Sequence, residues 1–156
     1  MERREFIALL GMATALMPAR AGAEPAHPGN SMISRLAGTW SFASSINTRR
    51  DGSVFDRWGS NPKGIFMFDA GGRYAQIIVG GESRVFGGKT YCAFGSYSTD
   101  DANKTFTTII DACSLAKFSG TAQTRAIIAL TPDELKYWNP VTTSGTTAEV
   151  IWKRVT

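Results

Sequence analysis

The stretch that decides the fold is Leu36-Ala37-Gly38-Thr39-Trp40, at the start of the first predicted strand. It is matched near the end of the chain by Val150-Ile151-Trp152-Lys153-Arg154-Val155. An indole can cover one end of a small closed barrel, and a cation on the last strand can lie on its face. Strand alternation separates Lys153 from Arg154 and favours Arg154 for this contact. We therefore expect a barrel floor made of Gly38, Trp40 and Arg154.

Between these stretches the chain has the pattern of consecutive β-strands. Short runs rich in aromatic and β-branched residues alternate with Gly, Asp and Asn turns such as Asp51-Gly52. The predicted strands are 39–46, 54–58, 64–69, 73–79, 90–98, 105–113, 123–130, 134–138 and 146–155. The pattern predicts an all-β fold, an antiparallel up-and-down β-barrel of about 8–10 strands. A short N-terminal helix over 31–37, with Ser31 as its N-cap, precedes it.

The alternative all-β architecture is an immunoglobulin-type sandwich. The chain lacks the widely separated cysteine pair around a tryptophan that marks the disulfide-bearing members of that class. The barrel is therefore favoured.

Residues 1–23 are interpreted as a cleavable signal peptide. Arg3 and Arg4 precede an apolar run that is too short to span a ~30 Å hydrocarbon core, and Ala21-Gly22-Ala23 offers a cleavage site. The arginine pair is similar to a twin-arginine export signal. An ordinary secretory signal, or a helix that stays attached, are the alternatives.

The leader divides the chain into three parts: the signal peptide at 1–23, a flexible tail at 24–30 and one barrel domain at 31–156. Export predicts a periplasmic or secreted bacterial protein. We expect no membrane span after cleavage, and a monomer or small homo-oligomer.

Composition narrows the chemistry. Seventeen basic residues against 13 acidic ones give a net charge of +4, and the basic residues are scattered, so nucleic acid is not an expected partner. The single histidine, His27, lies in the predicted tail. A Ser-His-Asp triad, a His-ligated metal and a proximal-His haem are therefore unavailable in the barrel. We expect no metal and no cofactor.

The two cysteines are Cys92 and Cys113. A hairpin that is symmetric about the turn at 100–104 places them directly opposite each other, with Cβ atoms ~4.5–5.5 Å apart. In an oxidising compartment this predicts a disulfide. A register shift of one residue would instead leave two thiols on opposite faces of the sheet.

Five polar or aromatic residues on the predicted strands are candidates to line a ligand cavity: Tyr74, Gln76, Tyr97, Arg125 and Tyr137. Arg125 is the only charge on its strand. If it points inward it needs an anionic partner, either Asp111 or the head group of a ligand. The alternative is that Arg125 faces solvent and that the tyrosines are core residues.

Two further functions remain open beside ligand binding. Asp111 faces Phe94 in the symmetric register, and a desolvated carboxyl there would have a raised pKa suited to proton transfer. This predicts a histidine-independent isomerase or cyclase. The other possibility is a structural barrel that its own Phe and Trp side chains plug, with no ligand.

The chain resembles the bacterial and fungal lipocalin-like domain family, a branch of the calycin-type β-barrels. The resemblance rests on Leu36–Trp40, Asp51-Gly52, Asn61-Pro62-Lys63-Gly64-Ile65-Phe66-Met67-Phe68, Gly72-Arg73-Tyr74-Ala75-Gln76, Phe94-Gly95-Ser96-Tyr97 and Ile151–Val155. It implies a lipocalin-like barrel with an apolar cavity for a small hydrophobic or amphipathic ligand, such as a fatty acid, isoprenoid, aromatic metabolite or quinone. Many relatives carry histidines on the strand that here reads Thr107-Thr108-Ile109-Ile110-Asp111, so any role of those imidazoles is absent here.

Overall fold

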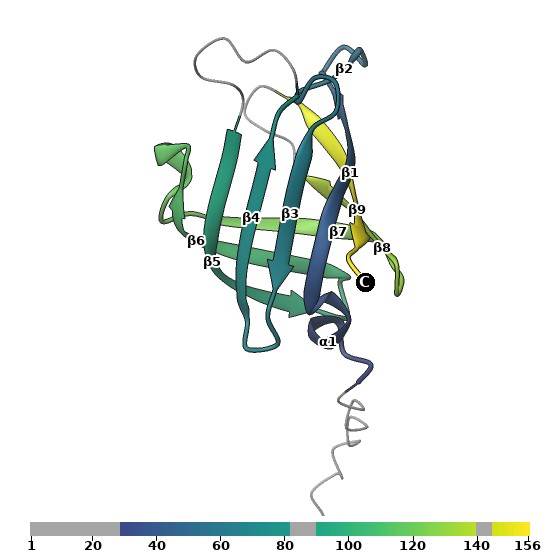
Figure 1. Cartoon of the computed structure of the whole chain (residues 1–156), viewed down its shortest axis with the longest axis vertical. Coiled ribbons are helices and arrows are strands. Elements are labelled where there is room, and N and C mark those ends of the chain that lie inside the picture. Colours follow the sequence, from purple (N-terminus) through teal and green to yellow (C-terminus); the bar gives the residue numbers. More distant parts are fainter. Residues whose placement is uncertain (1–28, 82–89, 140–144) are drawn as a thin grey trace, which may run out of the picture.

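The fold is a closed antiparallel β-barrel (Figure 1). The structure is a computed structural model that describes residues 29–81, 90–139 and 145–156. In these ranges the elements are α1 (Met32–Leu36), β1 (Gly38–Thr48), β2 (Val54–Phe55), β3 (Lys63–Phe68), β4 (Arg73–Val79), β5 (Thr90–Asp100), β6 (Thr105–Cys113), a 3-10 turn η1 (Ala116–Phe118), β7 (Ala122–Leu130), β8 (Glu134–Asn139) and β9 (Thr147–Arg154).

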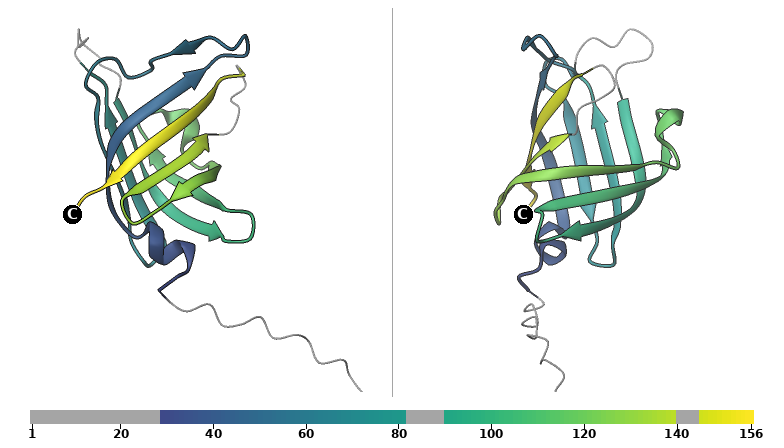
Figure 2. Two further views of the ribbon diagram at one scale, coloured as in Figure 1. Left: turned by 90° about the vertical axis from the view of Figure 1, so that its right-hand side faces the viewer. Right: turned by 180° about the vertical axis from the view of Figure 1, so that it is seen from behind.

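The strands wind around one axis in sequence order, as Figure 2 shows from two sides. Neighbouring strands from β3 to β9 pair antiparallel, and β1 pairs with both β3 and β9, which closes the barrel. β2 pairs only with the end of β1. The predicted all-β, up-and-down barrel with a short N-terminal helix is confirmed. Residues 1–28, which include the predicted signal peptide, Arg3, Arg4 and most of the tail, lie outside the described residues.

Local polar contacts set two element ends. The side chain of Ser31 accepts a bond from the Ser34 amide and caps α1. The strand predicted over 54–58 ends instead at Phe55, because the carboxylate of Asp56 accepts bonds from the Trp58 and Gly59 amides at 2.7 and 3.1 Å. Such an Asx turn competes with continued strand pairing.

The end of the barrel that carries α1 (bottom of Figure 1) is filled by aromatic rings; we call it the floor end. Trp40 and Phe66 are fully buried there. Ring centroids lie 4.1 Å apart between Phe66 and Phe68, and 5.3 Å apart between Phe66 and Trp152. The first pair is tilted and the second is edge-to-face, and such ring contacts add to the stabilisation from burying large apolar surfaces. The opposite end, which carries β2, is the upper end.

A cation lies on the tryptophan of the floor. The Arg154 guanidinium carbon is 4.0 Å from the Trp40 ring centroid. The same guanidinium donates to the carbonyls of Ala37 at 2.9 Å and Arg35 at 2.6 Å, which lie at the end of α1. Gly38 has a φ of 129°, and its lack of a side chain leaves room for the Arg154 guanidinium. Arg154 therefore ties the last strand to the helix and covers the floor.

The β5–β6 hairpin corrects the predicted cysteine pairing. Its register is symmetric from Asp100↔Thr105 to Gly95↔Ile110, as expected, but then shifts by one residue. Because the bulge is at Asp111, Cys113 lies opposite Ala93 instead of Cys92. Both cysteines are free thiols, and the expected disulfide is not present.

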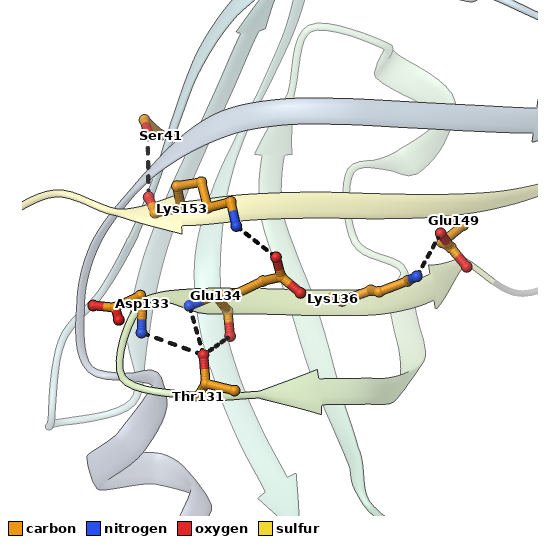
Figure 3. Close-up of polar contacts among 7 residues, drawn as sticks. All are labelled: Ser41, Thr131, Asp133, Glu134, Lys136, Glu149 and Lys153. Carbon is orange, nitrogen blue, oxygen red and sulfur yellow. Dashed lines mark hydrogen bonds and ion pairs between the residues drawn. The ribbon is translucent and has the colours of Figure 1, made fainter.

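The outer wall carries the charged pairs that Figure 3 draws on β8 and β9. Lys153 Nζ lies 2.6 Å from Glu134, and Lys136 Nζ lies 2.8 Å from Glu149. These carboxylates are thus held on the outside of the barrel. No helix within the described ranges is long and apolar enough to cross a membrane.

Candidate ligand-binding cavity

The upper half of the barrel interior is hollow. The cavity has a volume of about 720 Å³ and adjoins a smaller hollow of about 320 Å³ beneath β2. Its walls combine polar and charged residues, which include Asn47, Gln76, Gln123, Arg125 and Asn139, with apolar and aromatic ones: Phe55, Trp58, Ile78, Tyr91, Leu115, Phe118, Tyr137, Ala148 and Val150. A volume between about 300 and 1,000 Å³ with apolar walls and few polar groups is typical of small-molecule sites.

Strand alternation brings three of the five candidate residues to this cavity. Gln76 on β4, Arg125 on β7 and Tyr137 on β8 all point inward, are at most 5 % exposed and line the cavity. Tyr74 and Tyr97 also point inward but lie lower, among the rings of the floor end, and do not line it. The Tyr97 hydroxyl donates to the backbone carbonyl of Asp69 at 2.7 Å.

Arg125 is a buried cation with neutral partners. Its Nε donates to Oδ1 of Asn139 at 3.0 Å, and its Nη1 donates to Oγ1 of Thr108 at 2.8 Å. The Gln123 side chain and carbonyl accept two further bonds, at 2.7 and 3.3 Å. The guanidinium carbon also lies 5.7 Å from the ring centroids of Phe106 and Tyr137. The guanidinium is therefore held rigidly without a carboxylate.

Tyrosines surround this charge. Tyr137 is fully buried and accepts a bond from Nε1 of Trp152 at 3.1 Å. Burial raises the pKa of Tyr137 and of Tyr91, while the charge of Arg125 acts in the opposite direction on both. These phenols stay protonated at neutral pH and can donate hydrogen bonds.

Exposed cations lie on the upper rim. Arg57, in the loop that follows β2, and Lys117, in η1, both line the cavity. The Arg57 guanidinium is 5.6 Å from the Trp58 ring, and the Lys117 ammonium is 5.0 Å from the Phe118 ring. Within the described part of the chain no aspartate or glutamate lines the cavity. Its charged groups are all positive.

Asp111 does not belong to the cavity, which corrects the expectation that it faces Phe94 and is desolvated. It lies in the β6 bulge on the outer wall, and its carboxylate is 2.8 Å from Arg73 Nη2. Both side chains of this pair are about half exposed, at 45 % and 53 %. Asp111 is therefore neither the partner of Arg125 nor a carboxyl that a cavity ligand could contact.

Sequence reasoning missed Asn47, which is 3 % exposed and lines the cavity. Strict alternation from Trp40 would place Ile46 inside the barrel. The β1 register shifts between Phe42 and Ser44, so that Asn47 turns inward and Ile46 is 47 % exposed. A bulge of this kind reverses the faces of every residue that follows it. Asn139 and Trp58 were also missed, and neither carries a sequence signal that separates it from a structural residue.

No metal-binding constellation is present in the described residues, where no group of three or more His, Cys, Asp or Glu side chains could hold an ion. The site is therefore built from apolar walls, amides, phenols and cations.

Comparison with known proteins supplies no family or activity. No protein-family model and no curated protein matches the chain. Among solved structures it is similar to a redesigned β-barrel, with a TM-score of 0.46, 16 % identity and coverage of 80 % of this chain and 95 % of that one. It is also similar to a de novo designed fluorescence-activating β-barrel, with a TM-score of 0.45, 14 % identity and coverage of 79 % of this chain and 96 % of that one.

Bovine odorant binding protein, in a complex with a selenium-containing odorant, has a TM-score of 0.48 and 16 % identity. The alignment covers 87 % of this chain and 78 % of the odorant binding protein. The barrel that the lipocalin-like resemblance implied is present in the structure itself. Membership of the bacterial and fungal family stays a prediction.

Proposed function

We propose that this protein binds a small hydrophobic or amphipathic molecule inside its barrel. The observation that carries the proposal is the division of the interior. Aromatic rings fill the floor end, whereas the upper half contains a cavity of about 720 Å³. Walls that combine apolar side chains with fixed polar groups fit a ligand that has a hydrocarbon body and a polar end.

The two other functions have less support. A plugged barrel needs side chains throughout the interior, but the rings gather at the floor end. The isomerase or cyclase hypothesis relied on Asp111, which pairs with Arg73 on the outer wall. Binding without a reaction is the function that the geometry supports best.

The test is a calorimetric titration of the full chain with 1-decanol. We expect one molecule of 1-decanol to bind per chain. Ala148→Phe places a large ring into the cavity from β9, where Ala148 is 7 % exposed, and should weaken binding by about tenfold or more.

The matched control is Ala75→Phe. Ala75 lies between the inward-facing Tyr74 and Gln76 on β4, so its side chain is on the outer wall. The control should bind 1-decanol as the unaltered protein does. Equal binding by Ala148→Phe, or absence of binding by both 1-decanol and its charged ten-carbon analogues, would contradict the proposed function, provided that circular dichroism shows both variants to be folded.

The proposal includes export, supported by the features of residues 1–23. The protein would then act in the periplasm or outside the cell. N-terminal sequencing of protein recovered from the exporting cell should begin at Glu24, and Arg3→Lys with Arg4→Lys should block a twin-arginine route. An N-terminus at Met1 in the recovered protein would contradict export.

A further inference from the structure

Arg125 is the buried charge that the fold leaves unneutralised. It is 5 % exposed and has no ion pair within the described residues. Its hydrogen-bond acceptors are an asparagine amide, a threonine hydroxyl and the amide and carbonyl of Gln123. Taking a cation out of water without a counter-charge is unfavourable, and neutral dipoles offset only part of that cost. A residue in this state is suited to receive an anion.

The other charged groups strengthen this argument. The acidic side chains on the two strands beside β7 are already paired outside the barrel: Asp111 on β6 with Arg73, and Glu134 on β8 with Lys153. The cavity lining in the described ranges holds three cations and no carboxylate. The charges that line the cavity in these ranges are therefore all positive, and fixed charges of one sign in a low-dielectric cleft attract a ligand of the opposite sign.

An unpaired hydroxyl lies close to the same charge. The Tyr74 hydroxyl is the one buried side-chain polar atom, within the described residues, that makes no hydrogen bond. Burial raises the pKa of Tyr74, and the charge of Arg125 acts in the opposite direction. Tyr74 does not line the cavity, so Arg125 is the donor that a ligand in the cavity would reach.

We infer that the ligand is an amphipathic anion whose single acidic group contacts Arg125 while its apolar body extends toward the upper rim. This inference rests on the proposed function and specifies its ligand class. Besides Arg125, the cavity is lined by Ile78, Tyr91, Val150, Trp58 and Phe118. These side chains can bury the apolar body, and Arg57 and Lys117 at the rim would attract the anion during approach.

The orientation of the ligand follows from the difference in burial between Arg125 and the two cations at the rim. Arg57 and Lys117 are exposed and already hydrated, so they gain little from a carboxylate. Arg125 is already desolvated and fixed by its neighbours, so the anion meets a preorganised partner. The acidic group therefore lies against Arg125, beside Gln123 and Asn139.

Four ten-carbon probes with different head groups test the inference in the full chain: decanoate, decyl sulfate, 1-decanol and decylamine. At neutral pH, at least one of the two anions should bind about tenfold or more tightly than 1-decanol, because a hydrogen bond to a charged group outweighs one to a neutral group. Decylamine should bind more weakly than 1-decanol. The ratio of decanoate to decyl sulfate affinity distinguishes a carboxylate from a sulfate or phosphate ester.

Arg125→Gln should remove the preference for anions, so that the ratio of anion affinity to 1-decanol affinity falls about tenfold or more. Arg73→Gln, which removes an arginine from the outer wall, is the matched control and should keep the preference. If Arg125→Gln does not fold, the pH dependence of the unaltered protein replaces it. Decanoate affinity should fall as its carboxyl is protonated below pH ~5, whereas 1-decanol affinity should change little.

The outcomes separate the two proposals. If none of the four probes binds, the proposed function is wrong. If 1-decanol binds in the cavity as tightly as both anions, the function stands and the inference is overturned. Equal anion preference in Arg125→Gln and in the unaltered protein would also overturn the inference.

Discussion

A Cβ atom on residue 38 would lie 2.6 Å from Nη1 of Arg154, so a side chain at this position would collide with the Arg154 guanidinium. Real Cβ atoms do not approach other heavy atoms so closely. The φ of 129° at Gly38 is in a region that side chains rarely adopt. The contact between Arg154 and Trp40 therefore depends on the absence of a side chain two residues before the tryptophan.

Gly38→Ala should destabilise the protein. The backbone strain alone is worth roughly 1–3 kcal/mol, and displacement of Arg154 adds to it. Urea unfolding followed by tryptophan fluorescence measures the change. The control is Gly59→Ala, with a φ of 73° and open space around the added Cβ, which carries strain without the collision. Equal losses for the two variants would show that Arg154 does not depend on Gly38.

Arg154→Lys should also destabilise the barrel although it keeps the charge. Lysine has no planar group to stack on Trp40, and its single nitrogen replaces the two nitrogens that donate to the Ala37 and Arg35 carbonyls. We expect a loss of about 2 kcal/mol in the free energy of unfolding. Lys153→Ala on the outer wall, which breaks an exposed pair with Glu134, should cost less than about 1 kcal/mol. A loss for Arg154→Lys no greater than this would contradict the role of the floor contact.

Residue 93 can test the bulge in the β5–β6 hairpin. The Ser114 amide donates to the Cys92 carbonyl at 2.8 Å, which makes Cys92 and Ser114 a hydrogen-bonded pair. The neighbouring pair, Ala93 and Cys113, is then a non-hydrogen-bonded pair, in which the two side chains lie closer together than in a hydrogen-bonded pair. Ala93→Cys combined with Cys92→Ala should therefore form a disulfide with Cys113 under oxidising conditions. The unaltered chain should retain two thiols that alkylate without reductant after unfolding. A Cys92–Cys113 disulfide in the unaltered chain would contradict the observed register.

Alkaline pH should reduce the stability of the fold. Burial, together with the charge of Asp69, raises the pKa of Tyr97 from 10.0 to about 12. Above pH ~10 the unfolded phenol loses its proton while the folded one keeps it, so the stabilisation present below pH 10 is lost as the pH rises toward 12. Tyr97→Phe should show a smaller fall in the free energy of unfolding between pH 9 and ~12. Identical slopes for the two proteins would contradict this account.

The sequence predicted the strands because alternation and turn residues are local signals. Most boundaries are within two residues, and the Trp40–Arg154 contact follows from the same alternation. Local signals do not set the stagger of strands. Tyr74 and Gln76 share one face of β4, but Gln76 lies about 7 Å further along the strand, which puts it at the cavity and leaves Tyr74 in the filled half.

Bulges account for the other differences. The extra residue in β6 moved Cys113 away from Cys92. Asp111 instead follows the alternation of β6, in which Phe106, Thr108 and Ile110 are buried, and so it lies on the outer wall. The one signal for the extra residue was Gly95 in mid-strand, where a Cβ would lie 1.9 Å from the carbonyl oxygen of Ile109. The irregularity in β1 brought Asn47 inside. Both depend on how strands meet across the barrel, which alternation along a single strand does not encode.

The most direct test of the central claim is a crystal structure of the full chain with decanoate. The account predicts one decanoate in the upper half of the barrel, with its carboxylate within ~3.2 Å of an Arg125 nitrogen and its chain along Ile78 and Val150. Decanoate bound only on the outer wall, or a cavity that side chains fill, would contradict ligand binding inside the barrel. A reversed decanoate, with its carboxylate at Arg57 or Lys117, would contradict the role assigned to Arg125.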